Sequence, residues 1–363
     1  MQFQEKKLKV IQKLIDMRNS IQEAFLEDVK KIKKTCIEFL GDKINVFFYG
    51  SYGANQGGWI KIKDEYFPYN DYDILIVSDR AVKNKDNLIK LIKTKILEDV
   101  KIKFIDITIK SKKEVTSLKS TVENYDILNA SKHIFGEYDF RKYVEKIDKK
   151  DLSLEEVEKL FFTRLWIFSG AITSYEKDKT FRLTQIAKAL FAIVDSILIN
   201  KKNYESIYVQ KKEKIRQFLD DESFMIIDWA LKQRSLPKDV IEINNTLKYD
   251  EEYLTMFTAK MYRLYFLKLL SKKYNKSFQN INDFRKFYIC SFKVRMKQIL
   301  YPLIKRKSYS HEIIKMNAFM VKLSLILGEI SENEGKNILL KNKLLINDIE
   351  SSCDELCYKV ARS

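Results

Sequence analysis

Up to about residue 150, apolar residues occur at both helical and strand-like spacing, and after that point they occur at helical spacing alone. Before this point, helical stretches alternate with short β-rich runs. Residues 1–40 and 86–99 carry apolar side chains at helical spacing and predict helices. Residues 123–136 fit a helix and a strand equally well. Residues 51–70 contain glycines and a proline and are the most loop-like part of this half.

Three runs in the first half are rich in Ile, Val and Phe, and they predict strands. They span residues 44–50, 71–77 and 101–109. Gly50 ends the first run, and aspartates open the second. The pattern therefore predicts a small sheet that alternates with helices.

From residue 151 the helical spacing continues, with interruptions, to the C-terminus. Ser153 is a candidate N-cap for the first of these helices, with Glu156 three residues later. The cleanest series of apolar residues runs from Leu183 to Leu198. We therefore expect an α+β chain. Residues 1–150 would form a small mixed sheet flanked by helices, and residues 151–363 would form an all-helical domain.

Charge narrows the class of partner. The chain of 363 residues carries a formal net charge of +17, which favours nucleic acid, nucleotide or another acidic partner. A general enrichment in lysine explains the same excess without any such partner. Residues 293–309 combine lysines and arginines with tyrosines, as a single-stranded RNA or tRNA surface would. A solvated helix face explains that segment equally well.

Four cysteines and two histidines are too few and too scattered for a structural zinc site. Reduced thiols are expected. Residues 1–20 are charged throughout, so no signal peptide is expected. No apolar run approaches the ~18 residues of a membrane span. We therefore expect a cytoplasmic protein without membrane contact.

The candidate chemistry lies where the predicted strands end or begin. Gly50 and Ser51 follow the first strand, Asp71 and Asp73 open the second, and Asp106 lies within the third. Residues two apart on a strand point to one face, so Asp71 and Asp73 can share metal ions. Carboxylates suit Mg²⁺ or Mn²⁺, and two such ions neutralise a triphosphate and align a hydroxyl for attack. Gly50 lets the backbone approach phosphate, to which Ser51 offers a hydroxyl.

Each piece alone has an ordinary explanation. Gly-Ser after a strand is usually a turn, Asp-x-Asp is often a strand edge, and Asp106 alone is compatible with a surface position. Buried or half-buried carboxylates are costly, however, unless a cation or hydrogen bonds compensate them. The three pieces in this order are more specific than any one of them.

This order resembles the DNA polymerase β nucleotidyltransferase superfamily, in which Gly-Ser is followed by Asp-x-Asp and a third aspartate. The motifs cover about residues 44–110. The resemblance implies that Gly50 and Ser51 bind the triphosphate, that Asp71, Asp73 and Asp106 are catalytic and ligate Mg²⁺ or Mn²⁺, and that Asp106 helps to activate the acceptor hydroxyl. A following helical domain is typical of the family.

The chain departs from the family pattern in one respect, because residues 52–70 form a longer spacer than usual between Ser51 and Asp71. In the helical half, Lys188 is expected to reach the nucleotide phosphates across an interdomain cleft, although a solvated lysine is an equal alternative. Tyr204 and Tyr208 have the spacing to stack a base, but packing explains them better.

The resemblance implies transfer of an NMP from an NTP to an acceptor hydroxyl. We expect a macromolecular acceptor, either RNA such as tRNA or a protein side chain, because of the basic charge and the helical domain. A small-molecule acceptor or a cyclic-nucleotide product is the first alternative. A nucleotide- or RNA-binding module without turnover is the second.

Overall fold

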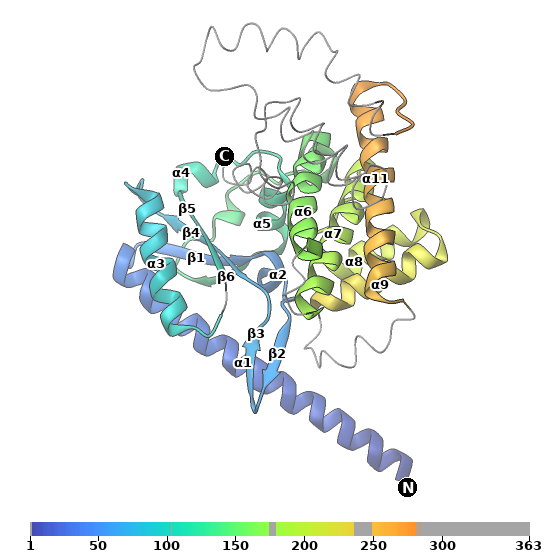
Figure 1. Ribbon diagram of the computed structural model, residues 1–363. Coiled ribbons are helices and arrows are strands. Elements are labelled where there is room, and N and C mark those ends of the chain that lie inside the picture. Colours follow the sequence, from blue (N-terminus) through green and yellow to red (C-terminus); the bar gives the residue numbers. More distant parts are fainter. Residues whose placement is uncertain (1, 103, 174–178, 236–248, 281–282, 284–363) are drawn as a thin grey trace, which may run out of the picture. The chain divides into compact units, whose positions relative to one another are not determined.

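The computed structural model describes residues 2–102, 104–173, 179–235, 249–280 and 283 (Figure 1). The chain folds into two compact units. The first consists of Met1–Leu152, Glu205–Glu213 and Leu231–Thr246. The second consists of Ser153–Tyr204, Lys214–Ala230 and Leu247–Ser363. The sequence predicts a single boundary near residue 150, whereas in the structure two later segments join the first unit.

The first unit is built on a four-stranded mixed sheet in the order β5-β4-β1-β6. Its strands are β1 (Ile44–Tyr49), β4 (Tyr72–Ser78), β5 (Ile105–Ser111) and β6 (Lys132–Phe135). Strands β4 and β5 are parallel, while β1 is antiparallel to both β4 and β6. The three predicted strands are therefore present, and the predicted α+β class with a small mixed sheet is confirmed.

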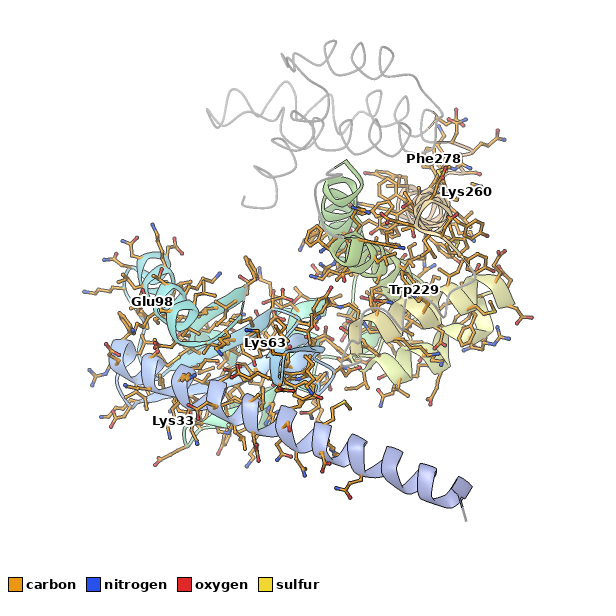
Figure 2. All side chains as sticks on the ribbon, turned by 60° about the horizontal axis from the view of Figure 1, so that its bottom comes forward. Lys33, Lys63, Glu98, Trp229, Lys260 and Phe278 are labelled. Atoms are coloured by element: carbon orange, nitrogen blue, oxygen red, sulfur yellow. The ribbon has the colours of Figure 1, made fainter. Side chains whose placement is uncertain are left out.

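The spacer between Ser51 and Asp71 contains more regular structure than its glycines indicate. Strands β2 (Trp59–Ile62) and β3 (Glu65–Pro68) form a separate two-stranded hairpin. Its turn begins at Lys63, which is labelled in Figure 2. Lys63 has a left-handed backbone with φ 57°. Aromatic and β-branched residues favour strands, and they outweigh the turn-forming residues around them.

Two helices cover one face of the sheet: α1 (Gln2–Leu40) and α3 (Lys85–Asp99) (Figure 1). Both were predicted. The end of α1 buries Ile32 and Cys36, and α3 buries Ile92 and Ile96 against the sheet. Charged residues such as Lys33 of α1 and Glu98 of α3 lie on the outer surfaces of the helices (Figure 2).

The other face of the sheet is covered by shorter elements: α4 (Lys112–Val115), α5 (Val122–Ala130) and the 3₁₀ turn η1 (Phe140–Lys142). A further 3₁₀ turn, η2, spans Lys149–Asp151. The ambiguous stretch 123–136 divides into most of α5 followed by β6. Thr121 caps α5 by accepting a hydrogen bond from the backbone N–H of Asn124. The core of this face is formed by Phe47, Leu75, Val77, Val115, Ile127 and Phe140.

All regular elements in the described part of the second unit are helical. Helices α6, α7 and α11 pack against one another, and Phe161 of α6 meets Tyr262 of α11 with ring centroids 4.9 Å apart. Helices α8 and α9 each contribute residues to both units. The elements are α6 (Leu154–Thr173), α7 (Lys179–Asn200), α8 (Tyr208–Ile215), η3 (Arg216–Phe218), α9 (Asp221–Ser235) and α11 (Glu251–Tyr274).

Within the described residues, Phe181–Asn200 of α7 is long and apolar enough to cross a membrane. However, 83% of its most apolar window is buried inside the protein, as in the core helix of a soluble bundle. The expectation that no apolar run approaches the length of a membrane span is therefore wrong for length and composition, while the burial of this helix is that of a core helix.

Candidate functional site

Strands β4 and β5 place two of the predicted aspartates side by side. The parallel register pairs Asp73 with Asp106, and Asp71 lies immediately before β4. Tyr72 and Ile74 join the core beneath α1 and α3, and on a strand their neighbours point to the opposite face. Asp71 and Asp73 therefore share that face, and both are half-buried.

The turn after β1 brings the Gly-Ser pair to the same place. It forms the short helix α2 (Gly50–Gly53). Gly50 has φ 62°, and a β-carbon on it would lie 2.1 Å from Asp73 Oδ2. Ser51 is only 6% exposed, and its carbonyl accepts a hydrogen bond from the backbone N–H of Gln56 at 2.7 Å. The glycine is therefore required both for the turn and for the position of the carboxylate.

A buried hydrogen bond anchors the Asp-x-Asp segment to α1. Tyr72 lies between the two aspartates in the sequence, and its hydroxyl donates to Asp28 Oδ2 at 2.8 Å. The ring of Tyr72 also packs edge-on against Tyr52, with centroids 4.6 Å apart. Burial raises the pKa of Asp28, and the bond from Tyr72 opposes that rise. This packing fixes the start of β4.

Tyr49, the last residue of β1, lies among the carboxylates. Its register partner on β4 is Asp73, and its hydroxyl hydrogen-bonds to Thr108 of β5. Burial raises its pKa most, followed by the negative charge of Asp73, with smaller contributions from Glu123 and Asp106. The negative charge of Asp73 therefore acts directly on the Tyr49 hydroxyl.

Asp106 already has a cationic partner. Lys93 of α3 lies 2.9 Å from Asp106 Oδ1 and also sits over the Phe104 ring, 5.5 Å from its centroid. The Asp106 side chain is 53% exposed. The sequence pattern around Asp106 indicates a partly buried residue, but its alternation on β5 turns it outward while Ile105 and Ile107 point into the core.

The predicted metal centre fits in part. Its donors are all carboxylate oxygens, the ligands that Mg²⁺ and Mn²⁺ prefer, and the register brings Asp73 beside Asp106. Across the described residues, however, no three His, Cys, Asp or Glu side chains converge closely enough to hold a metal ion. The carboxylate ligands and the strand register therefore suit a divalent cation, but the carboxylate side chains do not converge on one position.

Arg234 is a site residue that the sequence does not single out. It belongs to the first unit, through the segment Leu231–Thr246, and is 9% exposed. Its guanidinium hydrogen-bonds to Tyr208. Burial works against its charge, but Tyr208, Asp71 and Asp73 outweigh burial and raise its pKa. No sequence signal marks it, because it is one of 67 basic residues and lies far from the motifs.

Lys188 lies on α7 in the second unit and is half-buried. Its predicted contact with the nucleotide phosphates stays a prediction. Tyr204 is 1% exposed, so it is a packing residue and not a stacking platform. Tyr208 instead serves as the partner of Arg234. The basic segment 293–309 lies outside the described residues.

No protein-family model, no curated protein and no solved structure matches this sequence or fold. Function must therefore be inferred from the residues around Asp73.

Proposed function

We propose that the first unit is a Mg²⁺- or Mn²⁺-dependent nucleotidyltransferase that moves an NMP from an NTP to an acceptor hydroxyl. The observation that supports this most is the position of Asp73, with Gly50 packed against its carboxylate and Asp106 opposite it on β5. A turn or a strand edge with a purely structural role does not require Gly50, Asp73 and Asp106 to lie together. The resemblance to the polymerase β superfamily rests on the same residues.

In this proposal, Asp71 and Asp73 would hold the divalent cations, and Asp106 would be a further ligand when its carboxylate is not paired with Lys93. Bound divalent cations supply charge neutralisation of the triphosphate and alignment of the attacking oxygen. Ser51 offers its hydroxyl to phosphate oxygens. Asp106 orients the acceptor hydroxyl and draws off its proton. A bond forms from that oxygen to the α-phosphorus, the bond to the bridging oxygen breaks, and pyrophosphate leaves.

For the acceptor we favour a macromolecule in the cytoplasm, either RNA such as tRNA or a protein side-chain hydroxyl. The net charge of +17 supports an acidic partner such as RNA. The alternative from a different class is a nucleotide- or RNA-binding module without turnover. The presence of Asp71, Asp73 and Asp106 together argues against it.

The test is to incubate the protein with each α-³²P-labelled NTP, Mg²⁺, and total RNA and protein from cells. Transfer predicts a labelled macromolecule and released pyrophosphate. A labelled small molecule or cyclic nucleotide would keep the reaction class and change the acceptor. The matched control is the double variant Asp71→Asn/Asp73→Asn. Equal labelling by this variant, or no product with any NTP, would exclude the proposed reaction.

A further inference from the structure

Arg234 poses an electrostatic problem. A guanidinium that is 9% exposed requires compensation for its lost hydration. In the first unit this comes from the hydroxyl of Tyr208 and from the charges of Asp71 and Asp73. Under the proposed function those same carboxylates bind divalent cations. Once the cations neutralise them, Arg234 faces excess positive charge and needs an anion.

A short strap of the chain holds Arg234 in place. This strap, Glu205–Glu213, belongs to the first unit. The Ser206 hydroxyl donates to Asp126 Oδ1 at 2.6 Å, and the backbone N–H of Tyr208 donates to Gln56 Oε1. The Tyr208 hydroxyl then accepts from Arg234. The guanidinium is therefore tied through Tyr208 to Gln56, which follows the Gly50–Ser51 turn.

The side-chain amides of Gln56 and Asn70 each have a donor without an acceptor. Gln56 Nε2 and Asn70 Nδ2 are buried, and neither has a hydrogen-bond partner among the residues that the structure describes. Asn70 is 4% exposed and directly precedes Asp71, and its Oδ1 already accepts from the backbone N–H of Gly58 at 2.8 Å. Leaving a buried donor unsatisfied is costly, so such groups commonly mark a ligand or water position.

The Tyr52 hydroxyl connects these groups. It donates to the Gly58 carbonyl at 2.6 Å and also interacts with the backbone of Asn70. Burial raises the pKa of Tyr52, while the nearby charge of Arg234 lowers it and that of Asp71 raises it. The Tyr52 hydroxyl is therefore hydrogen-bonded to the backbone of Asn70 and feels the charges of both Arg234 and Asp71.

We propose that Arg234, Gln56 and Asn70 form the binding site for the β- and γ-phosphates of the NTP, the part that leaves as pyrophosphate. This inference rests on the proposed nucleotidyltransferase function and gives its triphosphate a second set of ligands besides Ser51. The planar guanidinium matches phosphate oxygens in bidentate geometry. The two orphaned amides donate to the remaining oxygens. A polyphosphate offers enough acceptors for all three groups.

The competing explanation is that Arg234 acts only as a counter-ion that stabilises Asp71 and Asp73. The two explanations differ in what the full-length protein binds. If Arg234 is only a counter-ion, its guanidinium interacts with the carboxylates alone and contributes nothing to the affinity for polyphosphate. A phosphate ligand gives affinity that appears when Mg²⁺ is present.

The experiment is isothermal titration of the full-length protein with inorganic tripolyphosphate in the presence of Mg²⁺. Wild type should bind, and Arg234→Met should bind at least about tenfold more weakly, as expected for loss of charge-assisted hydrogen bonds. Arg80→Met is the matched control, because Arg80 is exposed in the same unit. Its affinity should stay within about twofold of wild type, since exposed charges interact weakly with a distant ligand.

A second pair of variants keeps the test decisive if Arg234→Met fails to fold. Asn70→Asp retains the oxygen that accepts from Gly58 and replaces the orphaned donor with a negative oxygen. It should weaken tripolyphosphate binding about tenfold or more by repulsion and the lost donor. Asn87→Asp adds the same charge on exposed α3 and should bind like wild type.

Three outcomes would overturn the inference: no tripolyphosphate binding by wild type, wild-type affinity in folded Arg234→Met, or equal effects of Asn70→Asp and Asn87→Asp. The assay needs no acceptor and no turnover, so it is independent of the transfer reaction. Arg234-dependent binding without any transfer would remove the proposed function alone. Transfer with Arg234-independent binding would remove this inference alone.

Discussion

A β-carbon on Gly50 would lie 2.1 Å from Asp73 Oδ2, which is closer than non-bonded heavy atoms approach. Gly50 also has φ 62°, a left-handed backbone conformation that other residues rarely adopt. One glycine therefore sets the turn after β1 and leaves space for the carboxylate at the start of β4. Substitution of Gly50 by alanine should therefore have two effects: backbone strain, which lowers stability, and displacement of Asp73, which lowers activity.

We expect Gly50→Ala to abolish nucleotide transfer and to destabilise the protein. The control is Gly41→Ala, because Gly41 also has a left-handed backbone, with φ 77°, but nothing lies within 4 Å of its added β-carbon. Both variants should lose about 1–2 kcal/mol of stability from backbone strain in urea unfolding. Only Gly50→Ala should lose transfer. Equal activity in the two variants would contradict the role of Gly50 at Asp73.

Lys93 competes with a metal ion for Asp106, from which its Nζ is 2.9 Å away. Lys93→Met should therefore lower the Mg²⁺ concentration needed for half-maximal transfer by a few fold. The pair is partly exposed, so stability should change by less than about 1 kcal/mol. Lys95→Met, which removes a lysine paired with Glu98 on the same helix, should leave the Mg²⁺ dependence unchanged. A higher Mg²⁺ requirement in Lys93→Met would contradict this competition.

The buried carboxyl of Asp28 makes stability depend on pH. Burial raises its folded pKa above the unfolded value, so its contribution is fully present below about pH 3.9 and is lost as pH rises through the folded pKa. Asp28→Asn keeps an acceptor for Tyr72 and removes the buried charge. It should be more stable than wild type at pH 7 by on the order of 1 kcal/mol.

The measurement is urea unfolding of wild type and Asp28→Asn between pH 3 and 7. Their difference should shrink as pH falls and the wild-type carboxyl becomes protonated. Tyr72→Phe serves as the reference for the hydrogen bond itself, and should lose about 1–3 kcal/mol at pH 7 because Asp28 is left buried without its donor. A pH-independent gain in Asp28→Asn would show that the charge on Asp28 costs nothing.

Metal removal tests the carboxylate site as a whole. EDTA should stop transfer, and Mg²⁺ or Mn²⁺ should restore it, because all proposed ligands are oxygens. Asp71 and Asp73 also compensate the charge of buried Arg234, so Asp73→Asn should abolish transfer and lower the stability of the metal-free protein. Full transfer after removal of metal, verified by elemental analysis, would contradict a metal-dependent mechanism.

Much of the first unit follows from local patterns. The strands around Phe47, Ile74 and Ile107 were predicted because runs of β-branched and aromatic residues encode strands locally. The hairpin within 51–70 is not predicted, because its strands are only four residues long and show little alternation. Gly57 and Gly58 indicate a turn more strongly than these short strands indicate a sheet. Residues 123–136 stayed ambiguous because the stretch contains both a helix and a strand.

The sequence by itself determined the order Gly50-Ser51, Asp71, Asp73 and Asp106, and the alternation that sends Asp71 and Asp73 to one face of a strand. Such features depend on neighbours in the chain, which a single sequence displays. Only the tertiary structure decided that Asp73 pairs with Asp106, that Lys93 holds Asp106, and that Arg234 belongs beside the aspartates. The strand register and the assignment of the end of α9 to the first unit depend on packing between residues far apart in the chain. Local spacing does not encode such packing.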